Sequence, residues 1–187
     1  MKNVSIFNVY CNGLSIYTLC LLYFSLQILH LHNNLLTYLP DEMCRMPKLL
    51  VLVLAFNRFT TVPHMLLQSE ESSLRIDSLI MAGNRIEKLP HEVLNKIKHI
   101  KKIDFRMNKL TFSPNEMAKF HLLELVTHLD VRDNLITDLD VRPLRNLEYL
   151  NCERNSIHSL QVSGGAIKTL LAMNNGTFIY KCSKKCH

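Results

Sequence analysis

One pattern recurs along almost the whole chain of 187 residues and restricts its fold more than any other feature. It has the form Leu-x-x-Leu-x-Leu-x-x-Asn, with other apolar residues at some leucine places, and it occurs in tandem. The asparagines stand at Asn12, Asn34, Asn57, Asn84, Asn108, Asn134, Asn155 and Asn175. Their intervals are 22, 23, 27, 24, 26, 21 and 20 residues. Self-similarity at such a period indicates a stacked array of units rather than a single globular core.

Each fixed residue type has a physical reason. The last two apolar residues of a run alternate inward on a short strand, and strands of successive units pair in a parallel sheet. The asparagine follows the strand at a sharp turn, where its amide can bond backbone groups that the turn leaves unpaired. We therefore expect an asparagine ladder. The segment Pro90–Lys98 has helix-like apolar spacing, which places a helix on the other side of the unit.

This pattern is that of a leucine-rich repeat, and eight tandem matches predict an α/β solenoid. We expect a curved horseshoe segment with a concave parallel sheet. The prediction is one repeat domain over residues 4–180, with about eight repeats, and a divergent tail over 176–187. Because terminal repeats usually carry polar caps and none is recognisable here, we expect a section of a longer array.

The N-terminal apolar stretch Leu14–Leu26 admits two other interpretations. It is about 13 residues long and contains serine and threonine, whereas a membrane span needs roughly 20 apolar residues, so no span is predicted. A signal peptide is the second alternative. The lack of a small-residue cleavage site before Leu26, and the fit of this stretch to the repeats, favour a cytoplasmic repeat protein.

Beyond the general pattern, several strings resemble one family. They are Asn8–Leu14, Met81–Asn84, His99–Asn108, Val126–Asn134 and Cys152–Asn155. They are similar to the repeat region of the PH-domain leucine-rich-repeat protein phosphatases. The irregular intervals after Asn57, and the loss of the Leu-Pro signature after Asn108, resemble that region too. The similarity covers about residues 4 to 175.

The resemblance implies a targeting or regulatory segment rather than an enzyme. In that family a lipid-binding PH domain precedes the repeats, and a metal-dependent phosphatase domain follows them. Family members remove phosphate from protein kinases of the Akt and protein kinase C groups, so kinases or other signalling proteins are the implied partners. The phosphatase chemistry needs clustered aspartates with an Asp-Gly pair, and this sequence has no Asp-Gly. We assign no catalytic residue and no cofactor.

Two other interpretations of function remain open. The chain is then either an incomplete part of a full-length metal-dependent Ser/Thr phosphatase, or a small stand-alone scaffold of the Ras-pathway repeat type. Nucleic acid is not an expected partner, because the formal net charge of +6 does not gather on one face. No metal site is predicted, since His30 and His32 supply only two ligands.

Partner binding by such solenoids uses the concave face, so the side chains between the ladder leucines are the candidate site. The first half of this face is apolar and the second half is charged. The candidates are Val51, Val53, Phe56, Ile80, Asp104, Arg106, Asp130, Arg132, Tyr149 and Glu153. We expect the apolar members to form an exposed patch, or to be covered by a neighbouring domain. The charged members form either a salt ladder with diagonal Asp–Arg pairs or a docking strip.

Overall fold

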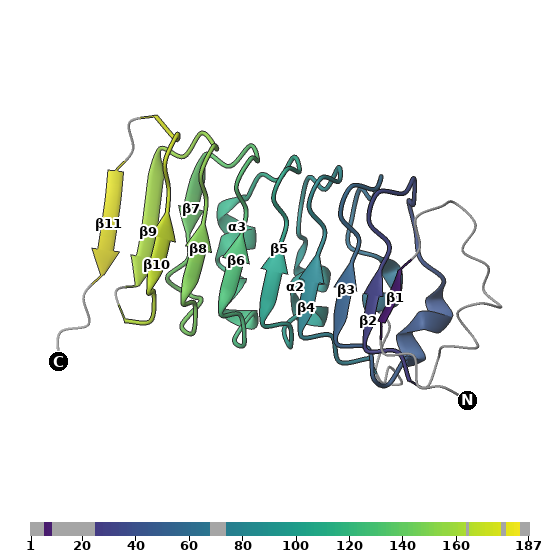
Figure 1. Ribbon diagram of the computed structural model, residues 1–187. Coiled ribbons are helices and arrows are strands. Elements are labelled where there is room, and N and C mark those ends of the chain that lie inside the picture. Colours follow the sequence, from purple (N-terminus) through teal and green to yellow (C-terminus); the bar gives the residue numbers. More distant parts are fainter. Residues whose placement is uncertain (1–5, 9–24, 68–73, 164, 177–178, 184–187) are drawn as a thin grey trace.

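The computed structural model describes residues 6–8, 25–67, 74–163, 165–176 and 179–183. Within these ranges the strands that precede the ladder asparagines form one parallel sheet of eight strands (Figure 1). The strands are β1 (Ile6–Asn8), β2 (Ile28–His30), β3 (Val51–Val53), β4 (Ser78–Ile80), β5 (Lys102–Asp104), β6 (His128–Asp130), β8 (Tyr149–Asn151) and β10 (Thr169–Leu171). They lie in chain order, so each unit contacts only its neighbours, as the repeat pattern predicts.

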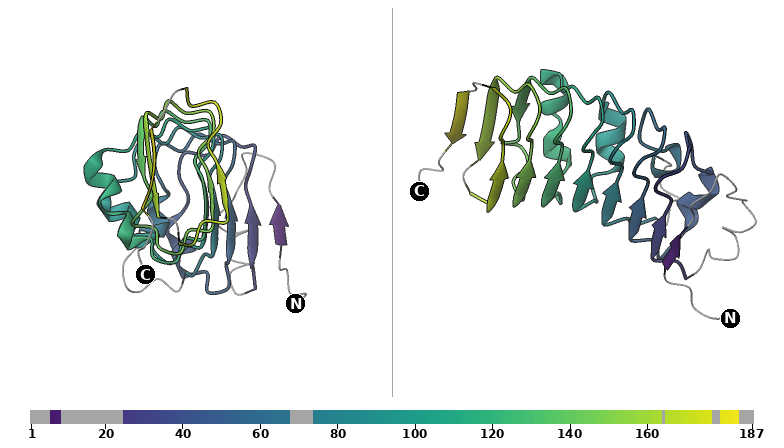
Figure 2. Two further views of the ribbon diagram at one scale, coloured as in Figure 1. Left: turned by 90° about the vertical axis from the view of Figure 1, so that its left-hand side faces the viewer. Right: turned by 45° about the horizontal axis from the view of Figure 1, so that its top comes forward.

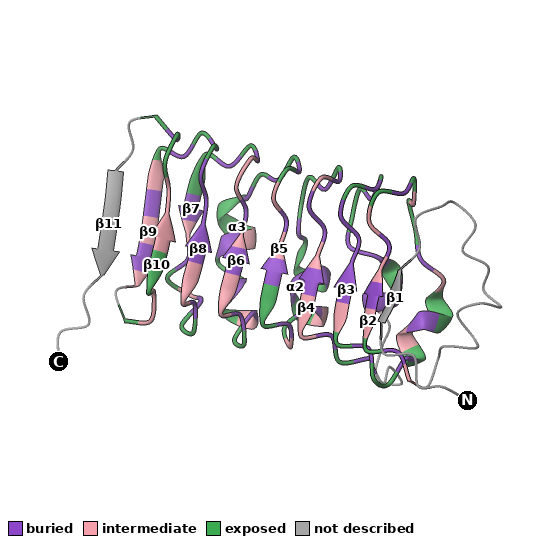
Figure 3. Cartoon of the chain, viewed as in Figure 1, coloured by how far each residue is buried: buried purple, intermediate pink, exposed green. Residues whose placement is uncertain are grey.

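The solenoid has two sides with the apolar core between them. The eight-stranded sheet lines the inner side of the arc, and the helices lie on the outer side (Figure 2). The central residue of each strand from β2 to β8 is buried (Figure 3). Leu52 and Leu54 are fully buried, which confirms the inward register predicted for them. Burying one leucine side chain contributes roughly 1.5–3 kcal/mol, and the ladder positions repeat this contribution in every unit.

The asparagine ladder lies where the sequence places it. The amide of Asn108 donates to the carbonyls of Met81, Phe105 and Arg106, at 2.9, 2.9 and 3.2 Å. Its oxygen accepts the Ile86 N–H at 3.0 Å, so the side chain joins two repeats. The same arrangement recurs, and its members are Asn57, Asn84, Asn134, Asn155 and Asn175. Asn34 is buried at the equivalent place, and Asn12 lies outside the described residues.

The residue before each ladder asparagine from Asn34 to Asn175 adopts the left-handed conformation. The φ angles run from +49° to +64° at Asn33, Phe56, Gly83, Met107, Asp133, Arg154 and Asn174. For an L-residue this conformation costs roughly 1–2 kcal/mol, which the hydrogen bonds of the adjacent asparagine offset. Gly83 has a second reason to be glycine. A Cβ there would stand 2.5 Å from the Phe56 ring, which packs directly over it.

The length of each repeat decides the structure of its outer side. Repeats with asparagine intervals of 23 to 27 residues form short helices there. These are η1 (Asp41–Arg45), η2 (His64–Leu66), α2 (His91–Lys96), α3 (Pro114–Met117) and η3 (Phe120–Leu122). Helix α2 confirms the apolar spacing of Pro90–Lys98, and a capping box between Ser113 and Glu116 begins α3.

The last repeats differ, because the outer side there is a second parallel sheet that the sequence pattern did not predict. It contains β7 (Asp138–Asp140), β9 (Ser159–Ser163) and β11 (Ile179–Ser183), in the order β11-β9-β7. The asparagine intervals have shortened to 21 and 20 residues. An extended residue spans about 3.3 Å and a helical residue about 1.5 Å, so a shorter repeat crosses the outer side as a strand. Strand β11 falls within the tail expected to diverge.

Candidate partner-binding face

The inner face is the set of side chains that the eight-stranded sheet turns away from the core. Strand register arranges them in rows across the sheet. One row contains Val51, Ser78, Lys102, His128 and Tyr149, and the next contains Val53, Ile80, Asp104, Asp130 and Asn151. A third row, two residues further along the chain, contains Ala55, Ala82, Arg106, Arg132 and Glu153. The structure therefore brings the predicted candidates onto one surface, in an apolar half on β3–β4 and a charged half on β5–β8.

The apolar half is not the exposed patch that the sequence suggested. Val53 is only 8% exposed, and it forms a small buried cluster with Ala55 and Ala82. Val51 and Ile80 are half-buried and pack against this cluster. Neighbouring strands lie about 4.8 Å apart, so medium-sized apolar side chains in register cover one another without a partner.

Phe56 is the exposed member of the apolar half. Its side chain remains 45% exposed, although its ring packs over Gly83 at the rim of the face. The ring thus covers backbone of the next repeat rather than standing free. Among the apolar candidates, only Phe56 at this rim offers an exposed apolar surface to a partner.

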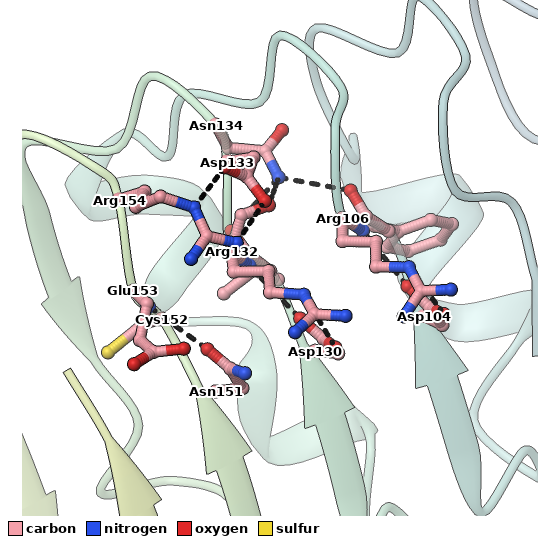
Figure 4. Close-up of polar contacts among 12 residues, drawn as sticks. Asp104, Arg106, Asp130, Arg132, Asp133, Asn134, Asn151, Cys152, Glu153 and Arg154 are labelled. Carbon is pink, nitrogen blue, oxygen red and sulfur yellow. Dashed lines mark hydrogen bonds and ion pairs between the residues drawn. The ribbon is translucent and has the colours of Figure 1, made fainter. Parts of the chain in front are cut away.

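The charged half is built from two identical Asp-x-Arg segments on neighbouring strands. One carboxylate oxygen of Asp104 accepts the Arg106 backbone N–H at 3.1 Å, and Asp130 accepts that of Arg132 at 3.2 Å. The second oxygen of each aspartate faces Nε of the same arginine at 3.5 Å. The ion pairs therefore form within each strand and not diagonally between strands, which corrects the sequence-based expectation (Figure 4). The in-strand geometry arises because the backbone N–H two residues on fixes each carboxylate.

Burial shifts the pKa values of these two aspartates more strongly than their arginine partners do. Burial raises the pKa of Asp104, while the Arg106 backbone N–H and guanidinium oppose the rise. It likewise raises the pKa of Asp130 against the opposing effect of Arg132. The neighbouring Asp130 charge adds to the rise at Asp104. The carboxylates thus lie beneath the surface, and the guanidinium groups are the more exposed ends of both pairs.

In two other Asp–Arg pairs the contact is bidentate, with Nε and Nη2 of the arginine each donating to one carboxylate oxygen. Arg154 donates from Nε and Nη2 to the two oxygens of Asp133 on the preceding repeat, the latter at 2.8 Å. Arg142 donates in the same way to Asp140 on the outer side, at 2.9 and 2.7 Å. Sequence reasoning missed the Asp133–Arg154 pair, although the signal was present. Both residues directly precede a ladder asparagine, so they occupy equivalent places in adjacent repeats.

Arg106 and Arg132 differ from those arginines. Across the described part of the chain, neither residue makes a hydrogen bond from its Nη atoms. A guanidinium has five N–H donors in a fixed plane, which suits carboxylate and phosphate oxygens. The two arginines therefore present unused donors just past the ends of the adjacent strands β5 and β6.

The row of arginines does not continue into the repeat of β8. Glu153 occupies the arginine row there and is only 7% exposed, so it offers little surface to a partner. Asn151 replaces the aspartate and keeps the same turn, accepting the Glu153 N–H at 3.1 Å. Its Nδ2 is buried and, among the described residues, has no hydrogen-bond partner. Tyr149 stacks on His128, with ring centroids 5.8 Å apart and an interplanar angle of 20°.

Comparison with known proteins agrees with this architecture. The family model Leucine Rich Repeat matches residues 25–46. Solved structures with the same fold include a leucine-rich-repeat protein of Leptospira interrogans, at 27% identity and a TM-score of 0.64, covering 81% of this chain and 38% of that one. The APL1 leucine-rich repeat domain gives a TM-score of 0.72 at 21% identity, covering 92% and 44%. This chain has the leucine-rich-repeat fold.

Curated proteins with similar sequences include a phosphatase. The rat PH domain leucine-rich repeat protein phosphatase 1 is 41% identical over 100 residues, which is 54% of this chain and 6% of that protein. The human PH domain leucine-rich repeat-containing protein phosphatase 1 is 40% identical over the same length. This chain therefore matches a small part of the length of these relatives. The repeat fold implies protein–protein interaction. No helix in the described ranges is long and apolar enough to cross a bilayer.

Proposed function

We propose that this chain is a non-catalytic repeat segment that selects partners for a phosphatase-like, cytoplasmic signalling protein. The observation that carries the proposal is the pair of arginines with unused donors, Arg106 and Arg132, side by side on the inner face. The similarity to phosphatase repeats supports the signalling context. Kinases or other signalling proteins are the proposed partners.

The absence of turnover is part of the same proposal. The Asp-Gly pair that the relatives' type of phosphatase chemistry needs does not occur in this sequence. We expect the purified chain not to hydrolyse a phosphopeptide with Mn²⁺ or Mg²⁺ present. Turnover that persists through repurification would contradict a non-catalytic role.

Charge reversal on the inner face tests the proposal. Arg106→Glu with Arg132→Glu should weaken capture of the cellular partner by at least about a hundredfold, because each arginine makes charge-assisted bonds of roughly 1.5–3 kcal/mol. Folding should change by no more than about 1 kcal/mol, since both side chains point away from the core. Capture is measured by quantitative pull-down, and folding by thermal melting.

A matched reversal on the outer side is the control. Lys88 and Lys119 are exposed and line a groove beside α2 and α3, far from the inner face in the repeat. Lys88→Glu with Lys119→Glu changes the net charge equally and should leave capture unchanged. Equal capture by all three proteins would show that the Asp-x-Arg segments are only a salt ladder. A large fall in melting temperature for the inner-face variant would show that the arginines hold the solenoid together.

A further inference from the structure

The geometry of the two arginines restricts what can bind them, provided that the inner face is a docking surface as proposed above. Strands β5 and β6 are direct neighbours, with Asp104 in register with Asp130. The ladder continues past the strands, since the Met107 N–H donates to the Arg132 carbonyl at 3.0 Å. The guanidinium-bearing residues are therefore spaced by one strand separation, about 4.8 Å.

The unused groups of this site are all donors, so its ligand supplies oxygen acceptors. Within the described ranges, Nε of each guanidinium lies 3.5 Å from its own aspartate, and the Nη atoms make no hydrogen bond. In the row that contains the two arginines, the neighbour of Arg106 is Ala82, which is fully buried. The neighbour of Arg132 is Glu153, a carboxylate that is nearly buried. The site is thus two guanidiniums wide, and a ligand that fills it brings two anionic groups or one that spans both.

Two singly charged carboxylates fit this site better than one phosphate dianion. Asp104 and Asp130 lie directly behind the guanidiniums, with side chains 20% and 14% exposed, and each cancels part of the neighbouring positive charge. A dianion centred between the arginines would face both carboxylates at once. One carboxylate on each guanidinium spreads the added charge and uses the planar fork bidentately.

The spacing also selects the conformation of the ligand. On a helix, side chains three or four residues apart share a face, with Cβ atoms about 5–6 Å apart and an axial rise of about 4.5–6 Å. On an extended peptide, side chains on one face recur only every ~6.6 Å. The helical spacing matches two arginines that are ~4.8 Å apart on adjacent strands.

We propose that Arg106 and Arg132 together bind the acidic face of a partner helix, through two carboxylates one helical turn apart. The helix axis crosses the strands of the inner face, so that each carboxylate meets one guanidinium.

The test uses designed helical peptides rather than an unidentified partner. The probe is a hydrocarbon-stapled Ala/Gln helix with two Glu residues four positions apart. Its comparison peptides carry Gln at both places, Glu residues two positions apart, or a single phosphoserine. Fluorescence anisotropy of the full chain should show the first peptide binding at least about a hundredfold more tightly than its Gln counterpart. Arg106→Gln with Arg132→Gln should abolish that difference, and Lys88→Gln with Lys119→Gln should keep it.

Each other outcome counts against the inference. Equal binding of the Glu and Gln peptides, or binding that survives loss of both arginines, overturns it, and so does a lack of binding by every peptide. Tighter binding of the phosphoserine peptide would assign the site to a phosphorylated ligand instead. Melting curves of the Gln variants confirm that they are folded. If the peptides fail while Arg106→Glu with Arg132→Glu still loses the cellular partner, the helix inference falls and the proposed function stands.

Discussion

The apolar half and the charged half of the inner face share one scaffold but satisfy their side chains differently. On β3 and β4, Val53, Ala55 and Ala82 bury one another, and little apolar surface is left for a partner. Just past β5 and β6, Arg106 and Arg132 extend over their own aspartates with most of their donors unused. Residue type alone therefore does not mark a binding surface. What distinguishes the charged half is hydrogen-bonding capacity that the fold itself does not consume.

The largest expected effect tests whether the two halves do share a scaffold. Asn84 supports the apolar half and Asn108 the charged half, and each amide donates to three carbonyls and accepts one backbone N–H. Substituting either by Ala leaves several buried backbone groups unpaired, which should lower the free energy of unfolding by about 2–4 kcal/mol. Urea denaturation of the two variants measures this. Losses that differ by more than about 2 kcal/mol would show that the two halves do not share one scaffold.

A smaller loss of stability is expected at the rim of the inner face. The position before the ladder asparagine has a left-handed backbone in both halves, but the residue there differs. Gly83→Ala should cost about 1–3 kcal/mol, from a φ of +64° and from the Phe56 ring that must move. Adding Phe56→Ala should reduce the cost of Gly83→Ala to its backbone part, about 1 kcal/mol. Met107 already tolerates a φ of +56°, so Met107→Gly should change stability by less than about 1 kcal/mol. Thermal melting of this series, compared pairwise, checks the expected order, and an equal cost of Gly83→Ala with and without Phe56 would contradict the packing argument.

The smallest effect concerns pH. Because burial raises the folded-state pKa of Asp104 and Asp130, the folded protein binds protons more readily than the unfolded chain in the window just above the ordinary carboxyl pKa. Their contribution to the free energy of unfolding therefore falls as pH rises through that window. Asp104→Asn with Asp130→Asn should be neutral or stabilising at pH 7, within about 1 kcal/mol, and should remove this slope. Asn keeps the acceptor for the backbone N–H, as Asn151 does at the equivalent place.

The pKa of Asp133 is shifted in the opposite direction, so its effect on stability has the opposite pH dependence. Its hydrogen bonds from Arg154 lower its pKa, so its stabilisation is present above the unfolded-state pKa and is lost as pH falls through the folded-state value. Asp133→Asn should therefore destabilise at pH 7, by less than about 1 kcal/mol because the pair is partly exposed. Urea titrations between acidic and neutral pH measure both variants. We expect the charge of Asp133 to stabilise the fold, whereas the charges of Asp104 and Asp130 do not. Stabilisation by Asp133→Asn, or clear destabilisation by Asp104→Asn with Asp130→Asn, would contradict this.

The repeat register could be predicted from the sequence because it depends on residues that occur at fixed places. The inward leucines and the buried asparagines Asn57, Asn84 and Asn108 each follow from one local pattern. The outer strands were not predicted, since their conformation depends on the length of the whole repeat and not on a local motif. Strand β9 forms where the asparagine interval shortens to 20 residues.

The candidate site could be predicted only as a surface. The alternation of strand residues placed Val53 and Glu153 on the inner face, but their burial depends on side chains of adjacent repeats. The partner of each aspartate could not be inferred from charge alone. Asp104 pairs within its strand because a backbone N–H holds one of its oxygens, and that bond is a property of the turn geometry.

The dissociation constant of the cellular partner, measured for matched variants of the two halves, shows which half of the inner face docks the partner. One variant carries Arg106→Gln and Arg132→Gln in the charged half, and the other carries Val51→Thr and Ile80→Thr in the apolar half. We predict at least about a hundredfold weaker binding for the first and less than about a threefold change for the second. An equal loss for both, or a loss confined to the apolar variant, would contradict the assignment of docking to the charged half.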